Sequence, residues 1–128
     1  MEGEAELWGF LEEHLRSIYE GDYAAYAATT HPELSLYEWF VTPHRLDGLE
    51  FHRFMVEKRW ATRGKPYRID LLERRLQRYG EVAIFSYTLL LTLEEEGGLR
   101  HQAVNESRVA VRFPEGWKVV HVHKSPAG

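Results

Sequence analysis

Residues 105–126, NESRVAVRFPEGWKVVHVHKSP, contain the pattern that decides the fold of this chain. Apolar and polar residues alternate from Val109 to Phe113 and again from Trp117 to His123, which is typical of strands with one buried face. Between the two runs, Pro114-Glu115-Gly116 supplies a tight turn. The stretch therefore predicts a β-hairpin with a buried face.

The opposite face of the first strand is unusual because it is charged. Side-chain alternation places Glu106, Arg108 and Arg112 together on this face. In the middle of a sheet both faces are covered, and a buried arginine without a partner is strongly destabilising. We therefore expect Arg108 to face a carboxylate or a polar cavity, and Glu106 is within its reach. The alternative is a solvated face on an antiparallel sheet.

The composition limits the class of protein. A chain of 128 residues can bury a real core, and we expect residues 1–128 to form one domain. The formal net charge of -4 and the absence of a basic-aromatic motif argue against nucleic-acid binding. Because there is no cysteine, disulfides, thiolate catalysis and thiolate metal sites are excluded.

The N-terminal sequence MEGEAELWGF lacks the basic start and apolar core of a secretion signal. No run of residues is long and apolar enough to span a membrane. We therefore expect a cytoplasmic protein with no membrane contact, and we expect no cofactor.

The rest of the chain reads as helices followed by strands. Spacing, capping and turn residues predict a helix over 4–20, a short helix over 23–29, a strand over 34–39, a helix over 48–62, and strands over 67–79, 82–93, 100–113 and 117–124. Helices that precede an antiparallel meander favour an α+β fold, with a curved sheet wrapped around the helices and a pocket at its open end.

Two predicted elements carry unusual side chains. In the strand 34–39, Glu38 continues the apolar face of Leu34 and Leu36. The helix 48–62 is predicted to begin with a capping box of Asp47 and Glu50. Its apolar positions cover much of its circumference, so it should be well buried; they are Leu49, Phe51, Phe54, Met55 and Trp60.

This order of elements is that of the cone-shaped nuclear-transport-factor-two-like fold, which includes SnoaL-like cyclases and ketosteroid isomerases. Several stretches narrow the resemblance to the association domain of calcium/calmodulin-dependent protein kinase II. They are EGDYAAY (20–26), PEL (32–34) with YE (37–38), LDGLEFHRF (46–54), ESRV (106–109) and GWKVVHVH (116–123). The resemblance covers about residues 5 to 126.

The resemblance implies a non-catalytic domain that assembles kinase subunits into stacked rings and has a pocket for small carboxylates. It implies that Arg108 is the family's pocket arginine and that Glu38 is the family's glutamate after the first strand. Thr88 stands where the family has another pocket arginine, and Met55 where it has an aromatic residue. The chain contains no kinase domain and no calmodulin-binding segment.

We predict that Arg108 and Glu38 form a polar pair inside the cone, and that Arg108 grips an anionic group which Glu38 or Glu106 orients. The alternative for Arg108 and Glu38 is a purely structural ion pair. The full set of predicted pocket residues is Arg108, Glu38, Glu106, His52, Tyr87 and Thr88.

Two other functions need to be weighed. His121 and His123 lie on one strand face, and His52 or His101 could join them, but two ligands are not a metal site, so we expect none. A SnoaL-like enzyme of the isomerase, cyclase or dehydratase type would use Glu38 as its base. An ionised Glu38 held by Arg108 would be a poor base.

The predicted function is therefore a stand-alone association-type domain with itself as partner, either as a homodimer or as a larger ring. Its polar pocket would bind a small carboxylate. The SnoaL-like enzyme is the alternative.

Overall fold

The computed structural model describes residues 3–60, 62 and 64–127. Two helices come first, α1 (Glu4–Tyr19) and α2 (Tyr23–Ala28), followed by β1 (Thr30–Glu38) and the short β2 (Leu46–Asp47). A helical turn, α3 (Glu50–Phe54), continues into the π-helical segment η1 (Met55–Trp60). The long strands are β3 (Tyr67–Tyr79), β4 (Val82–Glu95), β5 (Gly98–Phe113) and β6 (Gly116–Pro126).

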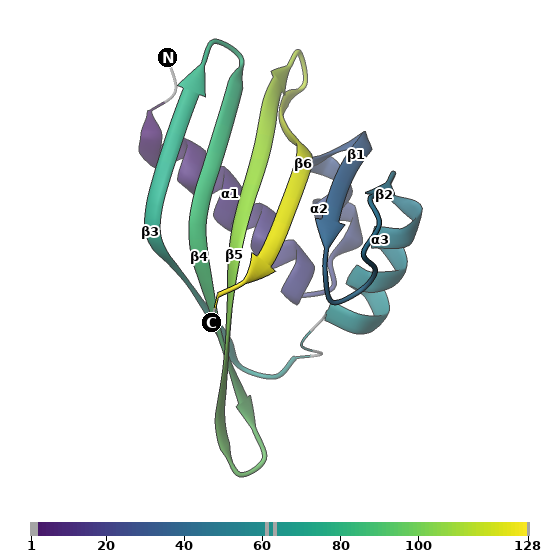
Figure 1. Ribbon diagram of the computed structural model, residues 1–128, viewed down its shortest axis with the longest axis vertical. Coiled ribbons are helices and arrows are strands. Elements are labelled where there is room, and N and C mark those ends of the chain that lie inside the picture. The colour runs from purple at the N-terminus through teal and green to yellow at the C-terminus, as the bar shows by residue number, and fades with distance from the viewer. Residues whose placement is uncertain (1–2, 61, 63, 128) are drawn as a thin grey trace.

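The strands form one sheet in the order β2-β1-β6-β5-β4-β3. Its neighbours are antiparallel except for β1 and β6, which run parallel. Helix α1 lies across one face of the sheet, and α3 lies beside β2 at one edge (Figure 1). The predicted α+β fold, with N-terminal helices and a curved sheet, is confirmed.

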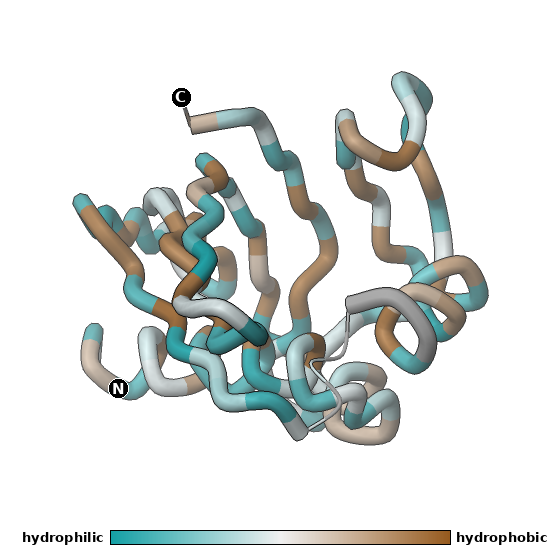
Figure 2. Tube along the Cα trace, turned by 90° about the horizontal axis from the view of Figure 1, so that it is seen from below, coloured by the Kyte–Doolittle hydropathy of each residue, from teal (hydrophilic) through white to brown (hydrophobic). Residues whose placement is uncertain are grey.

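Helix α1 packs on the sheet through a stripe of leucines. Leu7, Leu11 and Leu15 recur at the spacing of one helix face and are almost fully buried. Along the facing strands, apolar and polar residues alternate (Figure 2). Within the described part of the chain, no helix is long and apolar enough to cross a membrane.

The hairpin of β5 and β6 forms as predicted, and its turn places Gly116 at φ +125, a backbone conformation that favours glycine. The prediction of its buried face was wrong. Val109 and Val111 are only half-buried on the outer face of the sheet, whereas Glu106 and Arg108 face α1 and are buried. The charged face is inside because it finds partners there.

The segment 46–62 differs from its prediction. Asp47 lies in β2, opposite Ser35 of β1, and α3 begins after Leu49 with no side-chain cap, so the predicted capping box is wrong. The helix is also less buried than expected, because Phe54 is 51% exposed. Pairing of β2 with β1 holds this helix at the sheet edge instead of inside the cone. The side chain of Trp60 lies outside the described part of the structure.

The leucine stripe of α1 generates a stability prediction. Leu11 is fully buried, so Leu11→Ala leaves a cavity and should lower the free energy of unfolding by about 2–5 kcal/mol. Leu99, at the tip of the β4–β5 hairpin, is 66% exposed, and Leu99→Ala should change it by less than about 0.5 kcal/mol. Urea unfolding measures both, and equal losses would contradict the assigned packing of α1.

Candidate functional site

Arg108 is the centre of a buried hydrogen-bond network, which we call the Arg108 cluster: Arg108, Glu106, Tyr87, His14 and Thr29. The Nε and Nη2 groups of Arg108 donate to Glu106 Oε1 over 3.3 and 3.2 Å, and Nε also donates to the Tyr87 hydroxyl over 3.0 Å. The Tyr87 hydroxyl donates to the same Glu106 oxygen over 2.7 Å. Arg108 is 1% exposed, so these partners replace water.

His14 supplies the remaining contact of the guanidinium. Arg108 Nη1 lies 3.1 Å from His14 Nε2, and a guanidinium can only donate, so this ring nitrogen must accept. The other ring nitrogen, Nδ1, therefore carries the proton and donates to Thr29 Oγ1 over 2.8 Å. Burial and the neighbouring Arg108 charge both hold the pKa of His14 well below its usual value.

A second buried chain of contacts, the Glu38 cluster, consists of Tyr26, His52, Glu38 and Lys124. Glu38 accepts from His52 Nε2 over 3.3 Å and from Lys124 Nζ over 3.1 Å. Because His52 Nε2 donates, its Nδ1 accepts from the Tyr26 hydroxyl. Burial alone would raise the pKa of Glu38, but Lys124 and His52 outweigh it and lower that pKa.

Protonation in the Glu38 cluster follows from these contacts. Burial lowers the pKa of His52, although Glu38 opposes that shift, so the imidazole is neutral at pH 7. Burial also raises the pKa of Tyr26, which keeps the hydroxyl proton that His52 accepts. The rings of His14 and Tyr26 stack with centroids 5.0 Å apart, and this contact joins the two clusters.

A cavity lies beside these clusters and has a volume of about 300 Å³. Its walls are mainly apolar, with Ile18 from α1 and Leu89, Leu91 and Leu93 from β4. Glu106 and Lys124 reach it from the two clusters; Lys65, Glu95, Arg100 and Gln102 also line it. Phe40 lies at its side with the ring centroid 5.8 Å from the Lys124 ammonium. The cavity therefore offers apolar walls and a partly buried cation.

The predicted pocket residues divide into three groups. Glu106 lines the cavity, while Arg108, Glu38, His52 and Tyr87 are buried in the network behind it. Thr88 is on the other face of the sheet, where its hydroxyl donates to Asn105 Oδ1 over 2.6 Å. The prediction that Thr88 lies in an internal pocket is therefore wrong. Tyr87 and Thr88 are consecutive in β4 and must point to opposite faces.

The predicted direct pair of Arg108 and Glu38 is also wrong. Both side chains are buried inside the cone, but Arg108 pairs with Glu106 over 3.2 Å, whereas Glu38 pairs with Lys124 and His52. The reason is proximity, because Glu106 lies two residues from Arg108 on the same strand face. Ligand binding by these residues stays a prediction.

Three residues of the site were missed from the sequence. His14 lies within the leucine stripe of α1, where a polar residue on an apolar face was a usable signal. Lys124 follows Val122 on the inward face of β6, a placement that alternation also indicates. Tyr26 carried no such signal, because its contact with His52 depends on how α2 and α3 pack.

His121 and His123 lie on the outer face of the sheet with β1 residues. His121 Nδ1 lies 2.7 Å from Ser35 Oγ, and the His123 ring lies 5.3 Å from the Tyr37 ring. Burial and the nearby His123 lower the pKa of His121. Among the described residues, no group of three or more histidines and carboxylates could hold a metal ion.

Comparison with known proteins assigns the family. The sequence model of the calcium/calmodulin dependent protein kinase II association domain matches residues 3–128. The chain belongs to this family. A rabbit (Oryctolagus cuniculus) relative, calcium/calmodulin-dependent protein kinase type II subunit delta, is 28% identical over 94% of this chain. This chain spans 23% of the length of that relative.

Solved structures agree with this assignment. The hub homology domain of calcium/calmodulin-dependent protein kinase II from Chlamydomonas reinhardtii is 27% identical and covers 97% of this chain and 98% of its own, with a TM-score of 0.86. A nuclear transport factor 2-like superfamily protein from Salmonella enterica has a TM-score of 0.77, with 97% and 90% coverage. At 21% identity, it shows the fold alone.

The two buried histidines predict acid sensitivity. Their folded pKa values lie below that of an unfolded histidine, about 6.5, so at lower pH the unfolded chain binds more protons. The stability is complete above pH 6.5 and should fall as the pH decreases from 6.5 to 5. Urea unfolding across this range should show a shallower loss for His14→Gln than for the wild type. The exposed His101→Gln should leave the slope unchanged, and an unchanged slope for His14→Gln would contradict the buried neutral state.

The Arg108–Glu106 pair predicts strong non-additivity. Glu106→Ala leaves a buried guanidinium without its carboxylate and should cost about 3–5 kcal/mol of unfolding free energy. Adding Arg108→Met removes the stranded charge and should recover part of that loss. Denaturant unfolding of the two single variants and the double variant measures the coupling. Additive losses would show that the pair is not coupled.

Proposed function

We propose that this chain is a self-assembling association domain that forms a ring-like homo-oligomer, and that its cavity binds a small carboxylate. The assembly proposal rests on the family match over residues 3–128. It is supported by the near-complete overlap with the hub homology domain from Chlamydomonas reinhardtii. The likeness spans 97% of this chain.

The ligand proposal rests on the chemistry of the cavity. A volume of about 300 Å³ is at the lower end of small-molecule sites. Lys124 presents an ammonium group whose side chain is only 11% exposed, and apolar walls of β4 face it. A partly buried cation beside apolar walls suits a carboxylate on a short apolar chain.

We propose distinct roles for the predicted pocket residues. Lys124 contacts the carboxylate, and Glu38 and His52 hold the lysine in place from behind. Glu106 borders the ligand, and Arg108 and Tyr87 fix the orientation of the Glu106 carboxylate. Arg108 therefore acts through Glu106, since its own donors already have partners inside the protein.

The enzyme of the same fold is less well supported. A general base for proton abstraction works best with a pKa near the operating pH. Lys124 and His52 lower the pKa of Glu38, so its carboxylate is a weak base at neutral pH. Its oxygens are also engaged by those two residues, and Glu38 does not line the cavity.

Native mass spectrometry of the purified chain tests the assembly, and a ring of many identical subunits is the expected result. A single-subunit species at micromolar concentration would refute self-association.

Calorimetric titration tests the ligand, with hexanoate as the probe and uncharged hexanamide as its matched control. The wild type should bind hexanoate more tightly. Lys124→Met should weaken hexanoate binding about tenfold or more, since a charged hydrogen bond contributes about 1.5–3 kcal/mol. Lys124→Arg keeps the charge and should retain binding, and Lys118→Met, outside the cavity, should not affect it. Equal binding of hexanoate by Lys124→Met and the wild type would refute this site.

A further inference from the structure

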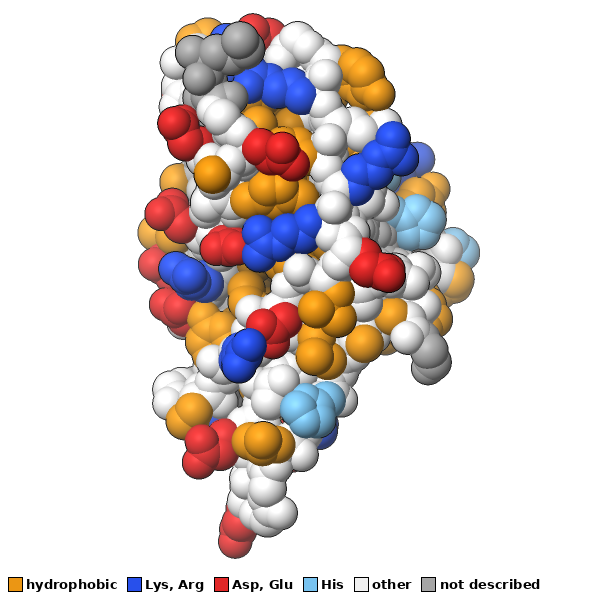
Figure 3. Space-filling view, turned by 90° about the vertical axis from the view of Figure 1, so that its left-hand side faces the viewer, with side chains coloured by type: hydrophobic (Ala, Val, Ile, Leu, Met, Phe, Trp, Pro, Cys, Tyr) orange, Lys and Arg blue, Asp and Glu red, His pale blue; other side chains and the backbone are white. Residues whose placement is uncertain are grey.

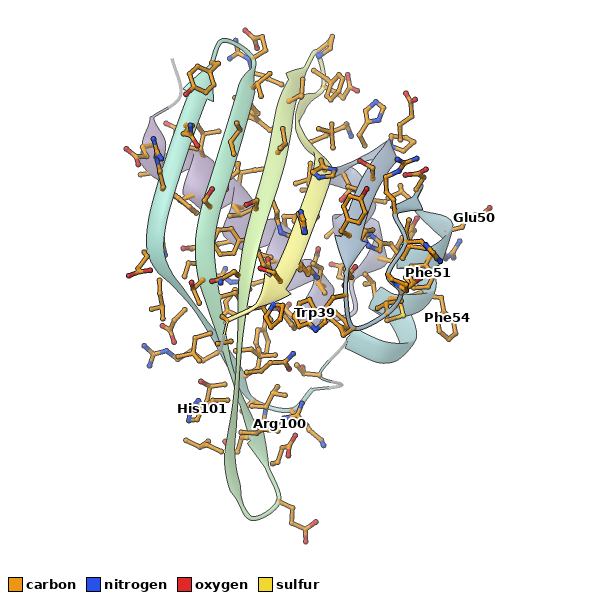
Figure 4. The ribbon with its side chains drawn as sticks, in the orientation of Figure 1. Trp39, Glu50, Phe51, Phe54, Arg100 and His101 are labelled. Carbon is orange, nitrogen blue, oxygen red and sulfur yellow. The ribbon has the colours of Figure 1, made fainter. Side chains whose placement is uncertain are left out.

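Two exposed apolar surfaces lie at opposite edges of the sheet. The first, the α3 surface, consists of Glu50, Phe51 and Phe54. Phe54 is 51% exposed, and Figure 4 shows it with Phe51 and Glu50 on the side of the molecule away from β3. The second, the β3 surface, consists of Leu72, Arg75 and Tyr79.

The β3 surface is on the outer side of an edge strand. Leu72 and Tyr79 are 45% and 63% exposed. They pair with Thr88 and Val82 of β4, and Arg75 pairs with Ser86, whose side chains all point away from α1. Figure 3 shows this side of the molecule, where apolar side chains lie among arginines and carboxylates.

The α3 surface needs a covering partner. A helix that is apolar around most of its circumference belongs in an interior, and the segment 49–56 has this pattern. Within a single chain, however, only its His52 and Val56 are buried among the described side chains, and Phe54 faces solvent. Burial of the remaining apolar positions therefore has to come from another molecule.

The charges on the two surfaces are complementary. Glu50 on the α3 surface and Arg75 on the β3 surface are both exposed. Within the described part of the chain, no ion pair involves either side chain. Each surface therefore combines an exposed apolar group with a charge, and the two charges have opposite signs.

The placement of the surfaces decides the kind of contact. The sheet order puts β2, with α3 beside it, at one edge and β3 at the other (Figure 1). A contact between two different surfaces is head to tail, and repeating it gives a closed ring when the rotation closes. The β3 edge also carries arginines and a bulge near Glu73, features that discourage strand addition. The contact is therefore made by side chains.

We propose that the partner of the α3 surface is the β3 surface of a second copy of this chain, and that this contact forms the ring. The inference rests on the proposed self-association and adds which surfaces meet. Phe54 of one copy packs against Leu72 and Tyr79 of the next, with Glu50 on the same side as Arg75.

Single variants test each surface separately. Phe54→Glu and Tyr79→Glu each place a carboxylate in the contact, and both positions are exposed in the single chain, so circular dichroism should show an unchanged fold. Native mass spectrometry should show the wild-type ring replaced by the smallest species in each variant. The control Leu99→Glu alters a position that is 66% exposed and lies outside both surfaces, and it should keep the ring.

Mixing the two variants gives the decisive result. Phe54→Glu retains an intact β3 surface and Tyr79→Glu an intact α3 surface, so one contact can form between them. The mixture should contain a species of twice the mass found in either variant alone. An assembly that survives Phe54→Glu, or a mixture no larger than its components, would overturn the contact while leaving self-association in place. A single-subunit wild type would instead overturn the proposed function, and this contact with it.

Discussion

The interior of this protein is arranged around one buried guanidinium, whose N–H groups need hydrogen-bond acceptors. Arg108 cannot lose its proton, and the surrounding Tyr87 and Glu106 raise its pKa further despite burial. It therefore needs acceptors in fixed places, which are supplied by Glu106 on its own strand, Tyr87 on β4 and His14 on α1. One side chain thus connects the first helix to the middle of the sheet.

This need for acceptors also explains the protonation states of the neighbouring side chains. His14 must stay neutral to accept from Arg108, and Tyr87 keeps its proton because burial and Glu106 raise its pKa. The hydrogen bonds of the guanidinium are consequently made within the protein, and Lys124 is the cation of the two clusters that lines the cavity. The family resemblance pointed to Arg108, and the contacts of Arg108 depend on His14, which lies in another element.

Side-chain alternation and helix periodicity located the strands correctly, but they did not predict the buried face of the β5–β6 hairpin or the structure of the segment 46–62. Alternation correctly put Glu38 with Leu34 and Leu36, because a strand has only two faces. The expected pairing of Glu38 with Arg108 failed, since alternation says which face a residue occupies and not which residue lies opposite. Thr88 was misplaced although alternation with Tyr87 excluded it from the interior. The exposed Phe54 shows that an apolar helix pattern predicts burial without saying whether the same chain supplies it.

Sequence alone determined the order of the helices and long strands, the hairpin turn at Gly116, the face that Glu38 shares with Leu34 and Leu36, and the family resemblance. These features follow from residues close together in the chain, where helix and strand periods and turn chemistry apply. Only the tertiary structure decided the parallel pairing of β1 with β6, the contact of His14 with Arg108 and the position of α3 at the sheet edge. Each of these depends on packing between segments far apart in sequence, which no local pattern encodes.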